Sequence, residues 1–421
     1  MIIIFDAHIH SYLSRATSKQ MNLEGLSKGA KLKGLNMLGT GDIFNPIWFK
    51  ELKQKLQPVD ESGLFQYKEI LWMLTGEVNT VYQQNNKTRK VHHLLHIPSF
   101  EIAEQIIEKL SRYGNLKADG RPTLQGLTSP ELVEILIGIS KDIMITPAHL
   151  WTSWFGALGE FSGFNSVEEC YQDQTKHIFS LETGLSSDPA MNWRISSLDK
   201  FALVSNSDSH SPWCWRLGRE ANCFNLEKLT YWEIVDAIKK KDKKKFLYTI
   251  EVDPNYGKYH WDGHRNCEIN LHPRDAMKLN NICPKCGKKL TIGVLHRVEE
   301  LADRPEGFVP KDAIPFKTLL PLYEIISFAW GCGELYSKKV LQEHNKLIEK
   351  FINELNVLLN VPKEELLKVT NEKIADAIIR VREGRVSYKP GADGQYGKVI
   401  FNEKFIQERT ELPNQKSLKD F

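Results

Sequence analysis

The 421-residue sequence predicts an α/β fold that is followed by a small metal-binding module and a mostly helical C-terminal region. Three observations predict this order. Short apolar runs alternate with amphipathic stretches through residues 1–235, histidines and cysteines gather within 254–305, and later apolar residues recur every three or four positions. Alternation of strands and helices at this spacing is typical of an α/β barrel or a wound sheet.

The N-terminal region contains most of the expected strands. They are predicted at 2–5, 34–40, 70–75, 91–97, 142–146, 178–183 and 202–205. Amphipathic segments at 99–113 and 129–140 predict helices between them. The second segment begins Ser129-Pro130-Glu131, a capping residue followed by proline in the first turn. Farther along, the spacing predicts helices over 337–360 and 363–383.

Composition excludes several classes of protein. A hydrophobic fraction of 41% and a charged fraction of 26% are ordinary for a globular chain, which argues against disorder. The net charge of +3 neither requires nor excludes a nucleic-acid partner. The start, MIIIFDAHIH, has no basic segment and is interpreted as a strand rather than a secretion signal. The sequence has no apolar run of ~20 residues, so we expect no membrane partner. Its seven cysteines show no disulfide pattern, so we expect a cytoplasmic protein.

Potential metal ligands lie at the ends of the expected strands. They are His8, His10, Asp42, Glu77, His92, His93, His149, Asp208 and His210. In an α/β barrel such strand ends converge on one face. The His-x-His and Asp-x-His spacings place both members of each pair on the same side of a strand. Imidazole and carboxylate groups are ligands of Zn²⁺ and Mn²⁺, so the pattern predicts a multi-metal site.

These motifs resemble those of the PHP (polymerase and histidinol phosphatase) phosphoesterases. The resemblance implies a distorted (β/α)₇ barrel with up to three metal ions at its mouth. It implies one site formed by His8, His10, Glu77 and Asp208. Glu77 would bridge to a second site that is completed by His149 and by either His92 or His93. Asp42, which stands where many members carry histidine, would complete a third site with His210.

The chemistry implied by the PHP resemblance is hydrolysis of a phosphoester. Water beside two or three divalent ions loses a proton near neutral pH, and the hydroxide attacks phosphorus in line. Glu77, Asp208 and His210 are the implied catalytic ligands. The active-site ions could be Zn²⁺, Mn²⁺ or Mg²⁺.

A second metal site is predicted from the spacing of cysteines. His264-Arg-Asn-Cys267 and Cys283-Pro-Lys-Cys286 form an HxxC…CxxC pattern that is typical of a four-coordinate structural zinc. His272 is the alternative to His264 as the fourth ligand.

The order of these parts resembles the endonuclease Q family of DNA repair enzymes. The resemblance rests on YHWDGHRNC, CPKCGKKLTIGVLHRVEELADR and KPGADGQYG. It implies a PHP barrel at 1–235, a zinc module at 254–305, a helical DNA-binding domain at 306–401 and a flexible tail at 402–421. The implied activity is metal-dependent cleavage of double- or single-stranded DNA, 5′ to a deaminated base (hypoxanthine, uracil or xanthine) or an abasic site. The implied location is the nucleoid.

Two other functions remain open at this point. A phosphatase of a small phosphate monoester would share the barrel ligands, and a non-catalytic DNA-binding module would share the zinc site. Candidate DNA contacts are Trp213, Trp215, Arg216, Arg219 and Lys389; buried tryptophan and ordinary surface charge are the alternatives. Gln415, Leu418 and Phe421 fit the peptide that binds sliding clamps (PCNA), and a polar tail without a partner is the alternative.

Overall fold

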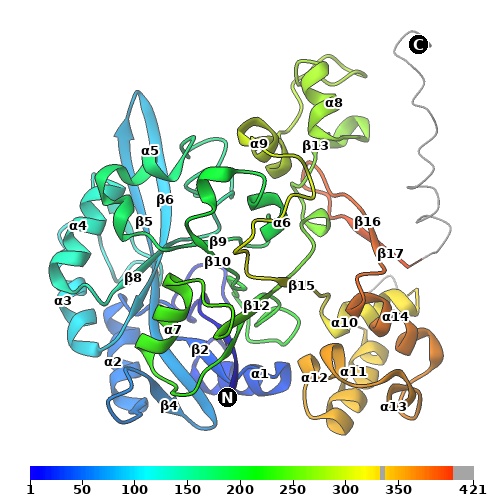
Figure 1. The fold of residues 1–421 in the computed structure, drawn as a ribbon, viewed down its shortest axis with the longest axis horizontal. Helices are drawn as coiled ribbons and strands as arrows, with labels where there is room; N and C mark the ends of the chain where they lie inside the picture. Colours follow the sequence, from blue (N-terminus) through cyan, green and yellow to red (C-terminus); the bar gives the residue numbers. More distant parts are fainter. Residues whose placement is uncertain (332–336, 402–421) are drawn as a thin grey trace.

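The N-terminal part of the computed structural model is built on one large mixed sheet (Figure 1). The structure describes residues 1–331 and 337–401. The strands of this part and their extensions are β1 Ile2–Asp6, β2 Met37–Gly39, β3 Gln57–Pro58, β4 Phe65–Tyr67, β5 Ile70–Gln84, β6 Lys87–Ile97, β7 Thr123–Gln125, β8 Met144–Pro147, β9 Ser180–Glu182, β10 Ala202–Val204, β11 Ala221–Asn225, β12 Phe246–Glu251 and β15 Phe316–Thr318.

Successive pairings close these strands into a distorted barrel. β1, β2 and β5 pair in parallel, and β5, β6 and β8 pair in antiparallel fashion. An isolated bridge between Ile145 and Ile178 joins β8 to the segment before β9, and β9 pairs in parallel with β10. A parallel bridge between Ile9 and Ser209 then joins the segment after β10 to the segment after β1. The α/β barrel expected from the sequence is therefore confirmed, and its distortion arises from the antiparallel β5–β6–β8 part.

The β5–β6 hairpin is longer than the sequence predicted. The expected strands ended at residue 75 and began at residue 91, whereas β5 and β6 pair continuously from Leu74 with Ile97 to Gln84 with Lys87. Asn85 and Asn86 form the turn with φ values of 54° and 58°. Two positive φ values are typical of the tight turns that match strand twist. As a result Glu77 lies within β5, and not after a strand as expected.

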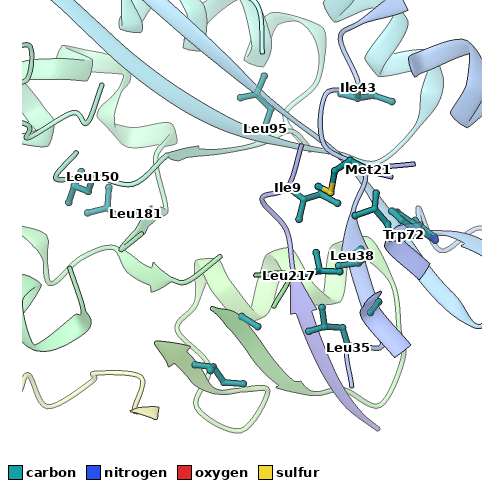
Figure 2. Close-up of a cluster of buried hydrophobic side chains, with 14 of the residues drawn as sticks. Ile9, Met21, Leu35, Leu38, Ile43, Trp72, Leu95, Leu150, Leu181 and Leu217 are labelled. Atoms are coloured by element: carbon teal, nitrogen blue, oxygen red, sulfur yellow. The ribbon is translucent and has the colours of Figure 1, made fainter. Parts of the chain in front are cut away.

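Helices pack around this sheet and cover its apolar faces. They are α1 Leu23–Lys33, α2 Pro46–Lys55, α3 Phe100–Leu110, α4 Ser129–Ile139, α5 Val167–Tyr171, α6 Pro189–Asn192 and α7 Tyr231–Lys239. The predicted start of α4 is present as a capping box, in which Thr128 and Glu131 bond each other's backbone N–H groups. Figure 2 shows part of the core, where Ile9 after β1 and Leu38 of β2 lie near Met21 and Trp72.

The remaining elements form two further groups (Figure 1). The first contains β13 Asp262–His264, β14 Ile269–Leu271, α8 Pro273–Lys278 and α9 Val294–Leu301. The second contains α10 Leu322–Ala329, α11 Lys338–Phe351, α12 Glu354–Leu359, α13 Lys363–Leu367 and α14 Glu372–Arg382. β16 Ser387–Lys389 and β17 Lys398–Ile400 then return to the first group, where Ala392 bridges to Trp261. Two later strands, β12 and β15, extend the sheet beyond residue 235.

The predicted helix over 337–360 is interrupted. Ile352 has a positive φ of 77°, which ends α11, and the Asn353 side chain caps the start of α12. This break turns Glu354 toward α1, where its carboxylate meets Lys33. Across the described ranges, no helix combines the length and the apolar character that a bilayer crossing requires.

Candidate metal centre

Glu77 lies at the middle of a cluster of histidines. Its Oε2 is 3.5 Å from Nε2 of His8 and 3.4 Å from Nε2 of His10. Its Oε1 is 2.6 Å from Nδ1 of His92 and 3.1 Å from Nε2 of His149. All five side chains are buried. The two carboxylate oxygens therefore face two separate pairs of imidazoles, which is the arrangement of a bridging metal ligand.

A third set of ligand atoms lies beside the first. Oδ1 of Asp208 is 3.0 Å from Nε2 of His10 and 3.7 Å from Nε2 of His8. Nδ1 of His210 is 3.8 Å from the same carboxylate oxygen. At this centre the described residues thus form three groups whose potential ligand atoms lie within 4.8 Å of one another: His8, His10 and Glu77; Glu77, His92 and His149; and His10, Asp208 and His210.

The backbone is strained at three positions of this centre. Asp42, His149 and Asp208 have φ values of 46°, 31° and 46°, in the left-handed region that residues other than glycine adopt rarely. Such conformations cluster at functional sites because the surrounding structure holds them in place. All three residues lie in the segments that follow β2, β8 and β10.

Asp42 contacts His10 but lies outside the three groups. Its Oδ1 is 2.9 Å from Nδ1 of His10, and its Oδ2 accepts hydrogen bonds from the Ser11 backbone and from the hydroxyls of Ser11 and Ser14. Both carboxylate oxygens are therefore already bonded. In this arrangement Asp42 orients the His10 ring so that Nε2 of His10 faces Glu77.

His92 and His93 face opposite sides of β6. His92 points to Glu77 and His149, whereas His93 lies 3.0 Å from the hydroxyl of Thr80 and 2.8 Å from that of Tyr171. Both ring nitrogens of His93 have partners away from the centre. The alternation of side chains along a strand makes this separation necessary.

Glu182 is a part of the centre that the sequence did not single out. Its Oε1 and Oε2 each lie 3.0 Å from Nδ1 of His8, and it also accepts hydrogen bonds from the His149 backbone N–H and the Asn206 amide. The signal was its place at the end of the strand expected over 178–183. An acceptor at Nδ1 leaves Nε2 of His8 free to bind a metal, a common outer-shell arrangement.

The electrostatics of the cluster favour bound cations. Burial alone would lower the pKa of His10, but Asp42 and Asp208 raise it to about 10. Burial likewise opposes ionisation of Glu77, yet His92, Arg121 and His8 hold the pKa of this carboxyl well below its usual range. The carboxylates thus stabilise positive charge in their midst.

The donor set also fits divalent ions. His8 Nε2, the ring nitrogen that faces Glu77, is buried and has no hydrogen-bond partner among the described residues. Unpaired buried nitrogens are costly unless a ligand satisfies them. Imidazole and carboxylate donors in groups of three suit Zn²⁺ or Mn²⁺.

The cysteine module brings its four predicted ligands together. His264, Cys267, Cys283 and Cys286 form one further candidate group, and Sγ of Cys286 lies 3.6 Å from Nδ1 of His264. His272, the alternative, instead accepts a hydrogen bond from the Arg274 backbone and packs edge-on against Trp261. Three thiols and an imidazole fit a closed tetrahedral zinc site.

The predicted DNA contacts differ in their exposure. Trp213 is 40% exposed and stacks on Trp215, which packs in turn on Tyr323 of α10. Arg219 points inward, where its guanidinium donates to the Ser207 carbonyl. Lys389 is the last residue of β16, and it is exposed beside a cavity of about 420 Å³. Arg216 is half-buried. Gln415, Leu418 and Phe421 lie outside the described residues.

An exposed aromatic pair lies next to the centre on the loop after β8. Phe155 stacks on His92 with ring centroids 4.5 Å apart. The neighbouring Trp154 is 54% exposed and stacks on Phe161, also at 4.5 Å. The ammonium group of Lys90 lies 5.7 Å from the Trp154 ring. This loop therefore presents aromatic faces beside a candidate ligand, and Lys90 of β6 places a cation next to them.

The barrel and its three ligand groups define the class of metal-dependent hydrolases. Two crystal structures resemble the whole chain. One is the lesion-specific endonuclease PfuEndoQ from Pyrococcus furiosus, with 36% identity, a TM-score of 0.87 and coverage of 100% of this chain and 98% of that chain. The other is endonuclease Q in complex with a 27-mer duplex substrate with an abasic lesion at the active site, with 36% identity, a TM-score of 0.84 and full coverage of both chains. The protein belongs to the endonuclease Q family.

Two curated sequences are also similar to this chain. The protein MJ0043 of Methanocaldococcus jannaschii is 35% identical over 61% of this chain, and the chain spans only 32% of that relative's length. YqxK of Bacillus subtilis is 28% identical over 94% of this chain and 99% of the relative. Residues 321–385, which contain helices α10 to α14 up to Arg382, match the model of the MJ0043 C-terminal domain.

Proposed function

We propose that the protein is a lesion-specific DNA endonuclease. It would hydrolyse the phosphodiester 5′ to a deaminated base (hypoxanthine, uracil or xanthine) or to an abasic site, in double- or single-stranded DNA. The observation that carries the proposal is full-length similarity, at 36% identity, to an endonuclease Q bound to duplex DNA with an abasic lesion. The three ligand groups around Glu77 and His10 support it, because phosphodiester hydrolysis by this class requires divalent ions.

The ligand residues of the centre would hold the ions in two sets. His8, His10, Glu77, Asp208 and His210 would hold ions on the open side, and His92 and His149 would complete the inner group with Glu77. Two or three divalent ions there (Zn²⁺, Mn²⁺ or Mg²⁺) would activate water and stabilise charge on the phosphate oxygens.

The position of His210 suits contact with the substrate. Its side chain is 36% exposed, whereas the other histidines of the centre are nearly or fully buried. Burial and the neighbouring His10 lower the pKa of His210, so its imidazole is neutral near pH 7 and can act as a ligand. The DNA strand would therefore approach from the side of His210.

The aromatic surface beside the centre supports a nucleic-acid substrate. Trp154, Phe161 and Trp213 are exposed, and exposed rings stack well on unpaired bases. A deaminated or missing base weakens pairing, which lowers the cost of opening the duplex at the lesion. Lys389 and Arg216 would contribute phosphate contacts.

The zinc module and the C-terminal tail extend the proposal. A structural Zn²⁺ at His264, Cys267, Cys283 and Cys286 would hold β13 and β14 against α8.

The tail pattern Gln415, Leu418 and Phe421 fits a sliding-clamp (PCNA) ligand, which would recruit the enzyme to DNA in the nucleoid. Loss of clamp binding in a pull-down on Phe421→Ala, with Lys416→Ala as control, tests the tail; equal binding by both would contradict it.

The alternative is a phosphatase of small phosphate monoesters. It would use the barrel ligands but would have no use for the zinc module or for α10–α14. A duplex with one deoxyinosine, one uracil or one abasic site is incubated with the protein and Mg²⁺, Mn²⁺ or Zn²⁺, with undamaged duplex and a chelator as controls. We expect a single metal-dependent nick 5′ to the lesion. Turnover of p-nitrophenyl phosphate without a nick would favour the phosphatase.

A further inference from the structure

A basic side chain reaches the metal centre from a segment in which the sequence indicated no site. Arg121 lies in the connection between α3 and β7, and its Nη1 donates a hydrogen bond to Oε2 of Glu77 at 3.1 Å. The arginine side chain is 28% exposed and that of Glu77 is 1% exposed. Arg121 therefore extends between the buried carboxylate and solvent.

The segment that carries Arg121 is held on both sides. A Cβ at Gly120 would lie 2.0 Å from Oδ2 of Asp42 and 2.1 Å from the Ser14 hydroxyl, so the backbone is packed directly against the ligand side of the barrel. The carbonyl of Pro122 accepts a hydrogen bond from the Asn79 backbone in β5. The backbone on both sides of Arg121 is thus anchored to the barrel.

The oxygen that Arg121 contacts is also the oxygen that faces His8 and His10. A divalent ion held by His8, His10 and Glu77 would use this Oε2 and would lie close to the guanidinium. Two cations at such a distance repel each other, most strongly away from water. An anion that touches both would stabilise the arrangement, and the phosphodiester of the substrate is such an anion.

We propose that Arg121 binds a non-bridging oxygen of the scissile phosphodiester, and that its hydrogen bond to Glu77 orients the guanidinium for this contact. The inference rests on the endonuclease function proposed above. A guanidinium carries several N–H donors in one plane, so one can remain on Glu77 while others face the phosphate. Lysine places its charge on one compact ammonium, which lacks the spread, planar fork that can face both acceptors at once.

The competing interpretation is that Arg121 only neutralises Glu77. The two roles predict different responses to the charge of the substrate. A phosphate contact depends on the non-bridging oxygen at one linkage, whereas a purely structural ion pair affects all substrates equally. Arg112, an exposed arginine that precedes the same segment, provides a control in which an equal charge is removed.

The test combines cleavage with DNA binding by the metal-loaded protein. Arg121→Ala, Arg121→Lys and Arg112→Ala are compared on a lesion duplex with either a phosphodiester or an uncharged methylphosphonate at the linkage 5′ to the lesion. Binding is measured by fluorescence anisotropy with Ca²⁺ replacing the catalytic ion. We expect Arg121→Ala to lower kcat/KM by about 10²–10³-fold, as loss of a transition-state donor does. We expect it to weaken binding about tenfold only on the phosphodiester duplex, and Arg112→Ala to match the wild type.

The outcomes separate this inference from the function on which it rests. An equal loss of affinity on both duplexes, or a loss of bound metal in Arg121→Ala by elemental analysis, would overturn the phosphate contact. Cleavage by Arg121→Ala at the wild-type rate would overturn it as well. Failure of the wild type to cut lesion DNA would instead refute the endonuclease function.

Discussion

The carboxylate of Glu182 lies 3.0 Å from Nδ1 of His8. The same carboxylate accepts a hydrogen bond from the backbone N–H of His149 at 2.7 Å, so one buried acid contacts two candidate ligands that follow different strands. Burial disfavours its charge, but His8 holds the pKa of Glu182 below its usual range. Glu182 is therefore an ionised acceptor when the centre is formed.

Glu182→Gln is expected to weaken binding of the active-site metal by about 10–100-fold, the usual cost of losing an outer-shell partner. The amide has one acceptor oxygen and would turn its N–H groups toward donors. Metal affinity is measured by competition with a chromophoric chelator. Glu168→Gln, an exposed acid paired with Lys200, is the control. Wild-type affinity in Glu182→Gln would contradict the orienting role.

Comparison of His92→Ala with His93→Ala should distinguish a metal ligand from a buried structural histidine. His92 faces Glu77, so its loss should lower metal content while the fold is retained. His93 hydrogen-bonds Thr80 and Tyr171, and its loss should lower the free energy of unfolding by about 1–3 kcal/mol because buried partners are left unpaired. Elemental analysis and urea unfolding distinguish the two, and the reverse pattern would reassign the ligand.

The fourth zinc ligand is tested by a matched pair of variants. His264→Ala should remove one equivalent of zinc from the purified protein, because His264 lies 3.6 Å from Cys286. His272→Ala should keep it, since His272 is occupied by the Arg274 backbone. Zinc is counted by elemental analysis after gel filtration. Loss of zinc in His272→Ala alone would exchange their roles.

Lys33 of α1 and Glu354 of α12 form a buried ion pair at 2.7 Å that joins the barrel to the helical region. Lys33→Ala is expected to destabilise the protein by about 3–5 kcal/mol, because an uncompensated charge remains buried. Lys31→Ala, which breaks an exposed pair with Glu69, should cost less than about 1 kcal/mol. Equal effects in urea unfolding would contradict the buried pair.

The same pair predicts how stability depends on pH. Burial would raise the pKa of Glu354, but Lys33 and His344 lower it to about 2 from an ordinary value of 4.5. The unfolded state therefore binds the proton first, so this contribution is complete above pH 4.5 and is lost as the pH falls toward 2. Urea unfolding should show a smaller loss between pH 5 and 3 in Glu354→Gln than in the wild type.

Gly120→Ala is expected to lower activity, because its Cβ would collide with Asp42 and Ser14 and displace the segment of Arg121. Gly138 in α4 has no atom within 4 Å of such a Cβ. Gly138→Ala should leave cleavage unchanged and stabilise the protein by about 0.5–1 kcal/mol, since alanine favours helix. Thermal unfolding and nicking rates check both, and unimpaired cleavage by Gly120→Ala would refute the close packing.

Much of the fold and of both metal sites could be predicted from the order of residue types along the chain. The His-x-His at residues 8 and 10, Glu77 and the Asp-x-His at 208 and 210 indicated the metal centre, because few combinations of side chains bind divalent ions. The HxxC…CxxC spacing indicated the zinc module in the same way. Periodicity indicated an α/β barrel or a wound sheet, since alternation of strands and helices leaves few ways to bury both, and the resemblance to the PHP family favoured the barrel.

Tertiary structure decided what depends on partners distant in sequence. Whether His92 or His93 faces the centre follows from the register of β6 against β5, and the extension of these strands past residues 75 and 91 follows from their pairing. Glu182 and Arg121 carry no motif, and they join the centre only because the barrel brings segments more than 40 residues apart within hydrogen-bond distance. Local sequence encodes which groups can bind metal, whereas long-range packing fixes which atoms meet.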